Sequence, residues 1–130
     1  MKLSKKIKSN NELCQSLNSY GNWHINMGHY DTAEIILRSA LEIAVKEGSI
    51  SDQAIINNNI GNTFTYRVVY DSALYYYIAA ENLFDKNKDF RRASILAINI
   101  SSIYTQIKLK DKAKEQAQKA VDLSIKMNDT

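Results

Sequence analysis

Few side chains in this 130-residue sequence could perform catalysis or hold a metal ion, and these few lack the required spacing. His24 and His29 are five residues apart, which places them on different faces of a helix, and no carboxylate or thiol completes a zinc set. Cys14 is the single cysteine and has no activating neighbour. Phosphate-binding loops and a nucleophile elbow are missing as well. We therefore predict no metal, no cofactor and no enzymatic activity, with His24 and Cys14 packed inside the fold.

The polar groups best suited to binding are asparagine amides within helical segments. An asparagine there costs roughly 0.5 kcal/mol relative to alanine, yet Asn57, Asn58 and Asn59 follow one another. A side-chain amide both donates and accepts hydrogen bonds, so it can pair with a peptide backbone of any sequence. One interpretation is ligand binding. The other is that Asn59 and Asn99 bridge neighbouring helices while the remaining amides are solvated.

These side chains are positioned by a motif that occurs three times. The pattern Asp-x-Ala-x6-Ala begins at Asp31, Asp71 and Asp111, so each copy starts 40 residues after the one before it. A fixed period in this range is typical of a solenoid, in which each unit buries its apolar face against its neighbours. Such proteins work through an extended surface, so the motif favours binding over a catalytic pocket.

The elements between the motifs read as long helices. Apolar residues recur at helical spacing, and the chain contains no proline and only four glycines. Ser49 or Ser51 can cap the third helix and Asp89 the fifth, while the motif aspartates fall in first turns, at the positive end of the helix dipole. We predict six helices, at about residues 10–27, 30–47, 51–67, 70–86, 90–107 and 110–127.

Small residues mark the predicted contacts within each helix pair. Gly21 and Gly61 lie one period apart, and Ser101 takes the same place in the third copy. The motif alanines form a stripe on each second helix, where small side chains let helices approach closely. We expect larger side chains to pack around these positions, namely Tyr20, Ile60, Ile100, Leu37, Tyr77, Trp23 and Tyr104.

The repeated units resemble the tetratricopeptide repeat, whose pattern is Leu-Gly, an aromatic residue, Gly-Asp-Tyr, alanine, a second aromatic residue and alanine. The first two copies match most of these positions, in the segments Tyr20-Gly21-Asn22-Trp23, Gly28-His29-Tyr30-Asp31, Ile60-Gly61-Asn62 and Tyr70-Asp71-Ser72-Ala73. The third copy departs at Ser101, Lys110 and Ala117, the family's terminal proline is missing throughout, and the period is 40 instead of the usual 34. The resemblance implies an all-α fold, a right-handed α-solenoid of three antiparallel helix pairs. The long period is similar to arrays in bacterial regulatory and sensor proteins.

The resemblance also implies a binding site, because first helices line the concave groove of such arrays. The residues that it places in or near the groove are Gln15, Asn18, Asn22, Ile25, Ile55, Asn58, Asn59, Asn62, Thr65 and Asn99. We predict that this neutral, asparagine-lined groove holds a protein or peptide segment, centred on the first two units. A family subset grips C-terminal carboxylates with asparagine, lysine and arginine, but the cationic positions here hold Asn18, Ile95 and Asn99. Neutral hydrogen bonds and apolar contacts are therefore expected instead.

The outer face offers an alternative function. Ile35, Ile36, Tyr75 and Tyr76 occupy outward positions of the second helices, where the third unit has Glu115 and Gln116. Exposed apolar clusters often mark interfaces, so the module could assemble structurally as a homodimer. The other interpretation is that these side chains fold down between the second helices.

Charge and boundaries complete the prediction. The net charge of +3 comes from lysines in residues 1–9, a basic tail that we expect to be frayed, and the remaining single domain at 10–130 is nearly neutral. Its repeats fall at about 10–49, 50–89 and 90–130. The near-neutral charge of the domain argues against a nucleic-acid partner.

No signal peptide or membrane span is apparent, and the lone cysteine fits a reducing compartment, so we expect a cytoplasmic protein. The end of a solenoid needs a polar cap, and the helix at 110–127 is polar enough to supply one itself. The alternative, which we favour, is that the chain is a fragment of a longer array.

Overall fold

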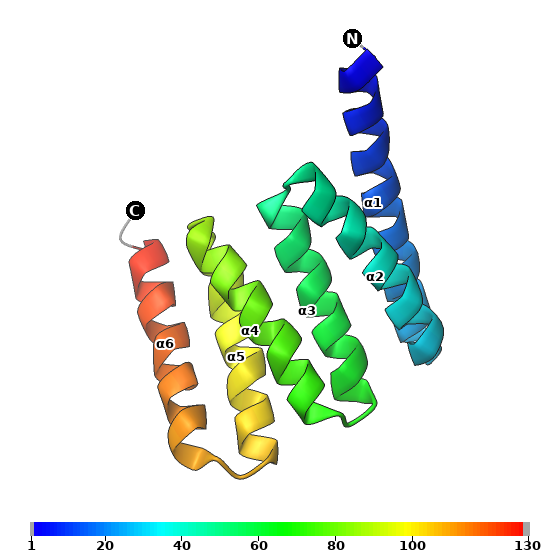
Figure 1. Cartoon of the computed structure of the whole chain (residues 1–130). Coiled ribbons are helices and arrows are strands. Elements are labelled where there is room, and N and C mark those ends of the chain that lie inside the picture. Colours follow the sequence, from blue (N-terminus) through cyan, green and yellow to red (C-terminus); the bar gives the residue numbers. More distant parts are fainter. Residues whose placement is uncertain (1, 129–130) are drawn as a thin grey trace.

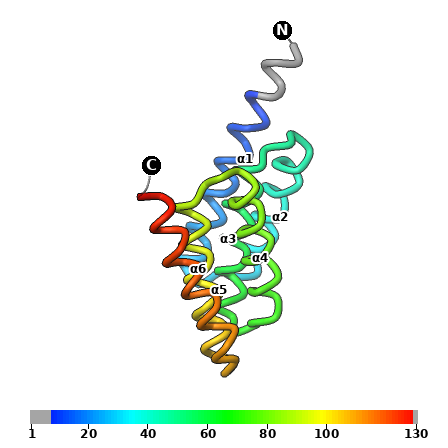
Figure 2. The backbone as a smooth tube through the Cα atoms, turned by 90° about the vertical axis from the view of Figure 1, so that its left-hand side faces the viewer, coloured from blue at the N-terminus to red at the C-terminus, as the bar shows by residue number. Residues whose placement is uncertain are grey.

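Six helices form three antiparallel pairs that lie side by side along the chain (Figure 1). This computed structural model describes the backbone of residues 2–128 and the side chains of residues 8–128. No strand occurs within the described backbone. Figure 2 views the stack end-on, from the side of the last pair. The helices are α1 (Lys2–Asn26), α2 (Tyr30–Glu47), α3 (Ile50–Tyr66), α4 (Tyr70–Lys86), α5 (Phe90–Gln106) and α6 (Lys110–Asn128).

The predicted boundaries are confirmed to within one residue for α2 to α6. Ser49 caps α3 by accepting a hydrogen bond from the Asp52 N–H at 3.3 Å, and Asp89 caps α5 in the same way. The first helix begins at Lys2, eight residues earlier than predicted, because neither proline nor glycine interrupts the sequence before Gly21. The tail side chains of residues 1–7 and the chain end at residues 129–130 lie outside the described residues.

All five connections between helices share one geometry. A residue in the left-handed region follows each of α1 to α5, and the next N–H bonds to the carbonyl five residues before it, as in His29 N to His24 O at 2.8 Å. This is the Schellman arrangement, which satisfies the last carbonyls of a helix. The left-handed residues fall 20 residues apart, at Gly28, Gly48, Val68, Lys88 and Lys108. The 40-residue period is therefore two helix-and-turn units of 20.

The small residues at the middle of the first helices are required by close packing. A Cβ atom on Gly21 would lie 2.6 Å from Leu37 Cδ2, and one on Gly61 would lie 2.5 Å from Tyr77 Cδ1. Both distances are too short for real contacts, so glycine is needed opposite these large side chains. In the third pair Ser101 faces a helix with Ala117 at the corresponding position, and its hydroxyl donates to Ala113 O at 2.8 Å. The predicted contact stripe is confirmed.

Polar contacts tie successive pairs together at both ends of the interface. On the first helices, Asn59 Nδ2 donates to Asn18 Oδ1 at 2.8 Å and Asn99 Nδ2 donates to Asn58 Oδ1 at 3.3 Å. We call these two bonds the asparagine ladder, because they repeat one period apart. The other ties are ionic. Arg67, just after α3, pairs with Glu34 and Asp31 of α2, and Lys119 of α6 pairs with Glu81 and Asp85 of α4.

Candidate functional site

Two hollows open between adjacent first helices, one period apart. The first hollow, of about 260 Å³, lies between α1 and α3, and the second, of about 200 Å³, lies between α3 and α5. The first is lined by Cys14, Gln15, Asn18, Ser19, Asp52, Ile55 and Ile56. The second is lined by Ile55, Asn58, Phe84, Arg92, Ile95 and Leu96. Ile55 lines both, so the two hollows adjoin one another along the first helices.

Each hollow carries a charge that the prediction of an uncharged groove did not include. Asp52 lines the first hollow and Arg92 lines the second, at the same position of successive repeats. Arg92 also pairs with Asp89 at 3.1 Å, yet its side chain remains 52% exposed. The signal for these charges in the sequence is that one position of all three repeats holds a charged residue, namely Glu12, Asp52 and Arg92. That position lies about one helical turn before the residues that we considered for the groove.

The asparagine ladder shows how several of the predicted amides are held. Asn59 is buried and donates to Asn18, and Asn99 donates to Asn58, so Asn59 and Asn99 bridge neighbouring helices. Asn57 is buried as well, and it donates to Gln53 O within its own helix. Asn18 and Asn58 use their carbonyl oxygens in the ladder, while their Nδ2 groups make no hydrogen bond within residues 8–128. Those two amides remain as donors on the walls of the hollows.

The other predicted groove residues divide by exposure. Asn62 Oδ1 accepts from the Tyr77 hydroxyl at 2.6 Å, and the same hydroxyl lies 2.9 Å from Thr65 Oγ1, so both residues hold Tyr77 in place. Ile25 is only 7% exposed and was wrongly assigned to the groove, because it packs in the core at the last turn of α1. Gln15 is exposed and Asn22 is half-buried.

The first helix differs from α3 and α5 because the described residues include no helix pair on its other side. Ile60 and Ile100 are buried as predicted, but Tyr20 is 53% exposed at the equivalent position, and Trp23 is 50% exposed. The two rings stack with centroids 6.2 Å apart. The prediction that both are packed was wrong, since no described residue covers these two rings. Tyr104, in the last repeat, does pack against the core.

His24 and Cys14, the two side chains of α1 considered for metal binding or catalysis, are both buried. His24 is buried as predicted, with its Nδ1 3.1 Å from His29 Nδ1, while its Nε2 has no hydrogen-bond partner within the described residues. No cluster of three metal-binding side chains occurs among the residues that the structure describes. Cys14 is buried with its thiol 3.4 Å from Ala40 O, and burial together with the charge of Asp52 raises the pKa of that thiol. A raised pKa disfavours the reactive thiolate.

The predicted outer cluster is divided between surface and interior. Ile35 and Tyr75 are exposed, at 68% and 70%, whereas Ile36 and Tyr76 are half-buried. The Tyr76 ring stacks on Phe64 at 5.7 Å and lies 5.5 Å beneath the Arg38 guanidinium. The helices α2 and α4 therefore each contribute one outward apolar side chain to the outer face, Ile35 and Tyr75 respectively.

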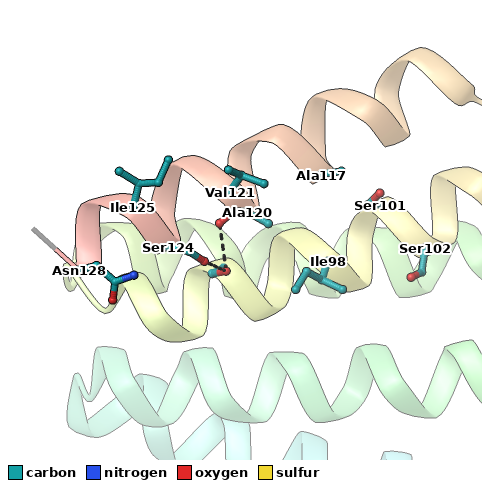
Figure 3. Close-up of a pocket in the computed structure, with 10 residues that line it drawn as sticks. Ile98, Ser101, Ser102, Ala117, Ala120, Val121, Ser124, Ile125 and Asn128 are labelled. Carbon is teal, nitrogen blue, oxygen red and sulfur yellow. Dashed lines mark hydrogen bonds between the residues drawn. The ribbon is translucent and has the colours of Figure 1, made fainter.

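A third hollow, which the sequence did not indicate, lies along the last helix pair (Figure 3). We call it the C-terminal groove, and its volume is about 460 Å³. Its rim is aliphatic, with Ile98 on α5 and Val121 and Ile125 on α6, all more than half exposed. The expectation that α6 caps itself with polar residues does not hold on this side. The remaining lining residues are Ser94, Ser101, Ser102, Ala117, Ala120, Ser124 and Asn128.

Three stacked helix pairs with a 40-residue period and hollows between successive first helices define an α-solenoid of the protein-binding class. A model of the tetratricopeptide repeat matches residues 15–44 and 96–124, which fall in the first and third repeats. These matches assign the first and third repeats of the chain to the tetratricopeptide repeat family. This fold is a protein-interaction fold and is generally non-catalytic.

Solved structures agree on the fold. The tetratricopeptide domain of Arabidopsis FLU superposes with a TM-score of 0.81 at 14% identity, over 87% of this chain and 95% of that one. BtubC (BKLC) from P. vanneervenii superposes with a TM-score of 0.80 at 20% identity, over 88% of this chain and 46% of that one. No curated protein matches the sequence. Among the described helices, none has the length and apolar character needed to span a membrane.

Proposed function

We propose that the face formed by the two hollows binds an extended segment of a partner protein. The observation that carries the proposal is the repetition of one hollow at a one-repeat offset, with an amide donor in each, at Asn18 and Asn58. Donors spaced along a groove can bond to successive backbone carbonyls of an extended peptide. Gln15 adds an exposed amide to the first hollow, and Asn22 adds a half-buried one farther along α1.

The charges of the hollows specify the ligand further. Asp52 in the first hollow favours a basic side chain, and Arg92 in the second favours an acidic one. Packed helix axes lie about 8–10 Å apart, and a polyproline-type segment advances about 9 Å in three residues, which returns its side chains to one face. We therefore propose a ligand with a basic and an acidic residue three positions apart, held in an extended conformation.

A synthetic peptide pair tests this proposal. One labelled peptide carries Lys-x-x-Glu and its mirror carries Glu-x-x-Lys within the same extended, proline-containing frame, and both are titrated against the chain by fluorescence anisotropy. The peptide whose charges oppose Asp52 and Arg92 should bind at least tenfold more tightly than the other. The double variant Asp52→Arg/Arg92→Asp should invert that preference, while Lys114→Asp on the outer side of α6 leaves it unchanged. Equal binding of both peptides by every protein contradicts the proposal.

The setting that we propose is a cytoplasmic regulatory protein in which this module is non-catalytic. The buried thiol of Cys14 fits a reducing compartment. The regulatory role and a bacterial source are supported by the resemblance of the long period to arrays of that kind.

Self-association through the outer face is a second candidate function, favoured by the exposure of Ile35 and Tyr75. These residues hold equivalent positions on α2 and α4, so together they form an apolar surface that water disfavours. Light scattering across a wide concentration range should then show a dimer that Tyr75→Glu dissociates. A protein that stays monomeric throughout rules this candidate out.

A further inference from the structure

The two hollows of the proposed peptide site differ in the chemistry of their walls. Gln15 of α1 lines the first hollow, and Ile55, one repeat later on α3, takes that position in the second. Ile95 of α5 lines the opposite wall of the second hollow, while Phe84 and Leu96, which are 2% and 1% exposed, form its base. Four of its six lining residues are therefore apolar.

The apolar surface of the second hollow is open to solvent. Ile95 is 48% exposed and Ile55 is half-buried. A single exposed aliphatic residue is ordinary on a protein surface, but these two lie on opposite walls above a buried apolar base. Concave apolar surfaces with a few polar groups are typical of binding sites, and those for drug-sized molecules measure about 300–1,000 Å³. The second hollow, at about 200 Å³, is smaller and has the size to accept one side chain.

Polar groups stand at the rim of the same hollow. Arg92 is tied to Asp89 at 3.1 Å, and its side chain is 52% exposed. Asn58 Oδ1 accepts from Asn99 at 3.3 Å, which joins α3 and α5 beside the hollow and fixes the separation of its walls. Asn58 Nδ2 makes no hydrogen bond within residues 8–128. An apolar side chain can therefore enter the hollow while the rim binds a carboxylate and a backbone carbonyl.

The Asn58 amide distinguishes an extended segment from a folded surface. Its Nδ2 needs an acceptor, and the carbonyls of a helix are mostly bonded within that helix, whereas those of a polyproline-type segment have no internal partner. A second copy of this chain presents helices joined by short turns, so it offers few free carbonyls. A further repeat would not fill the second hollow either, because the first hollow stays open although a third repeat follows it.

We propose that the second hollow seats one aliphatic side chain of the extended partner segment, directly next to the acidic residue that pairs with Arg92. This inference rests on the proposed function and adds an apolar anchor to it. A polyproline-type segment has three residues per turn, so two of its three edges can contact one surface. The basic and acidic residues, three positions apart, occupy one edge. The aliphatic neighbour of the acidic residue occupies the second edge.

The test uses the preferred member of the charged peptide pair, with leucine or alanine placed directly before or directly after its glutamate. Fluorescence anisotropy with the full chain should show leucine binding at least fivefold more tightly than alanine at one of these positions, since apolar pockets discriminate by side-chain size. Ile95→Gln, which gives the α5 wall the residue type of Gln15, should reduce this ratio below twofold and keep the charge preference. Ile98→Gln is the matched control, because Ile98 is 53% exposed on the same helix and lies outside the hollow. It should leave the ratio unchanged.

The outcomes separate this inference from the function on which it rests. A charge preference without a difference between leucine and alanine at either position overturns the inference and leaves the proposed function in place. An equal fall of the ratio in Ile95→Gln and Ile98→Gln, both shown by circular dichroism to keep their helicity, also overturns it, because leucine would then pack on α5 without using the hollow. A dimer in light scattering that Ile95→Gln dissociates would make a second copy the occupant. Absence of the charge preference overturns the proposed function and this inference with it.

Discussion

At the residue scale, the turn between α3 and α4 contains the least favourable backbone conformation of the five connections. Val68 has a φ of 61°, whereas the same position of the first two turns is glycine. A β-branched residue is rare in the left-handed region, where its conformation costs about 1–3 kcal/mol. Its side chain is 64% exposed and recovers little of that free energy through packing.

We predict that Val68→Gly stabilises the protein. Relief of the strain exceeds the roughly 0.5–1 kcal/mol of chain entropy that glycine adds to the unfolded state, so the free energy of unfolding should rise by about 1 kcal/mol. Urea denaturation followed by circular dichroism measures this change. Val69→Gly is the matched control, because Val69 has an ordinary φ of −102° and should gain nothing. A lower stability for Val68→Gly contradicts the interpretation.

Some residues of the candidate site could be predicted from the sequence, and others could not. Asn18 and Asn58 could be placed in the groove from their position before the mid-helix glycine. Asp52 and Arg92 were missed. The three repeats hold Glu, Asp and Arg at this position, and the sequence alone does not show that two of these side chains line hollows. The burial of Ile25 was also missed, since an aliphatic residue at a position held elsewhere by threonine can turn toward the core. Side-chain direction at helix ends depends on neighbours that periodicity alone does not reveal.

At the scale of elements, the asparagine ladder fixes each first helix against the next. The amide of Asn59 is nearly buried and its bond to Asn18 crosses from α3 to α1. Removing one partner leaves a polar group without its bond, whereas replacing both partners removes the requirement. The ladder therefore contributes to the register of the helices as well as to stability.

We predict that Asn59→Ala lowers the free energy of unfolding by about 1–2 kcal/mol, since Asn18 Oδ1 loses its donor. Asn82→Ala on the exposed side of α4 is the matched control, because it carries the same gain in helix propensity. The double variant Asn18→Leu/Asn59→Leu should be less destabilised than Asn59→Ala. Chemical denaturation at one pH compares all three, and equal effects of Asn59→Ala and Asn82→Ala would show that the ladder contributes nothing.

Helix positions were the most predictable elements. The identical 20-residue spacing of turns follows from local sequence, because each helix and its Schellman turn are closed by backbone bonds within six residues. The early start of α1 was not predicted, since nothing local marked where the helix begins. Lysine-rich segments without glycine or proline are compatible with both a helix and a frayed tail.

At the scale of the whole molecule, the ionic ties between pairs make stability depend on pH. Burial disfavours the charge of Glu34, but the hydrogen bonds and charges of Arg38 and Arg67 outweigh it and lower the pKa of its carboxyl. A carboxyl with a lowered folded pKa stabilises the fold above its unfolded pKa, and that contribution is lost as pH falls through the folded value. Glu81 has the opposite sign, because burial raises its pKa despite Lys119.

Glu34→Gln should therefore lose less stability on acidification than the unmodified chain. The comparison is made by urea denaturation at pH 7 and at several values below about 4.3, the ordinary pKa of glutamate. Glu81 titrates in both proteins, so its contribution cancels in the difference. An identical fall in stability for both proteins means that the Arg67 tie does not couple the first two pairs.

The ends of the array are where sequence periodicity predicted least. Tyr20 and Trp23 were expected to pack because their counterparts do, and α6 was expected to cap itself because it is rich in lysine and glutamine. A contact made in one repeat predicts the equivalent contact 40 residues away only where that second residue also has a neighbouring repeat to pack against. The first and last helices lack one neighbour each, so their exposed faces have to be determined from the structure.

Amide chemical-shift mapping of the chain with the oppositely charged extended peptide is the most direct test of the proposed binding face. The largest changes should fall on residues that line the two hollows, at Gln15, Asn18, Ile55, Asn58 and Arg92, and should disappear in the Asp52→Arg/Arg92→Asp variant. Changes concentrated at Ile35 and Tyr75, or along the C-terminal groove, would contradict the assignment of ligand binding to the first helices.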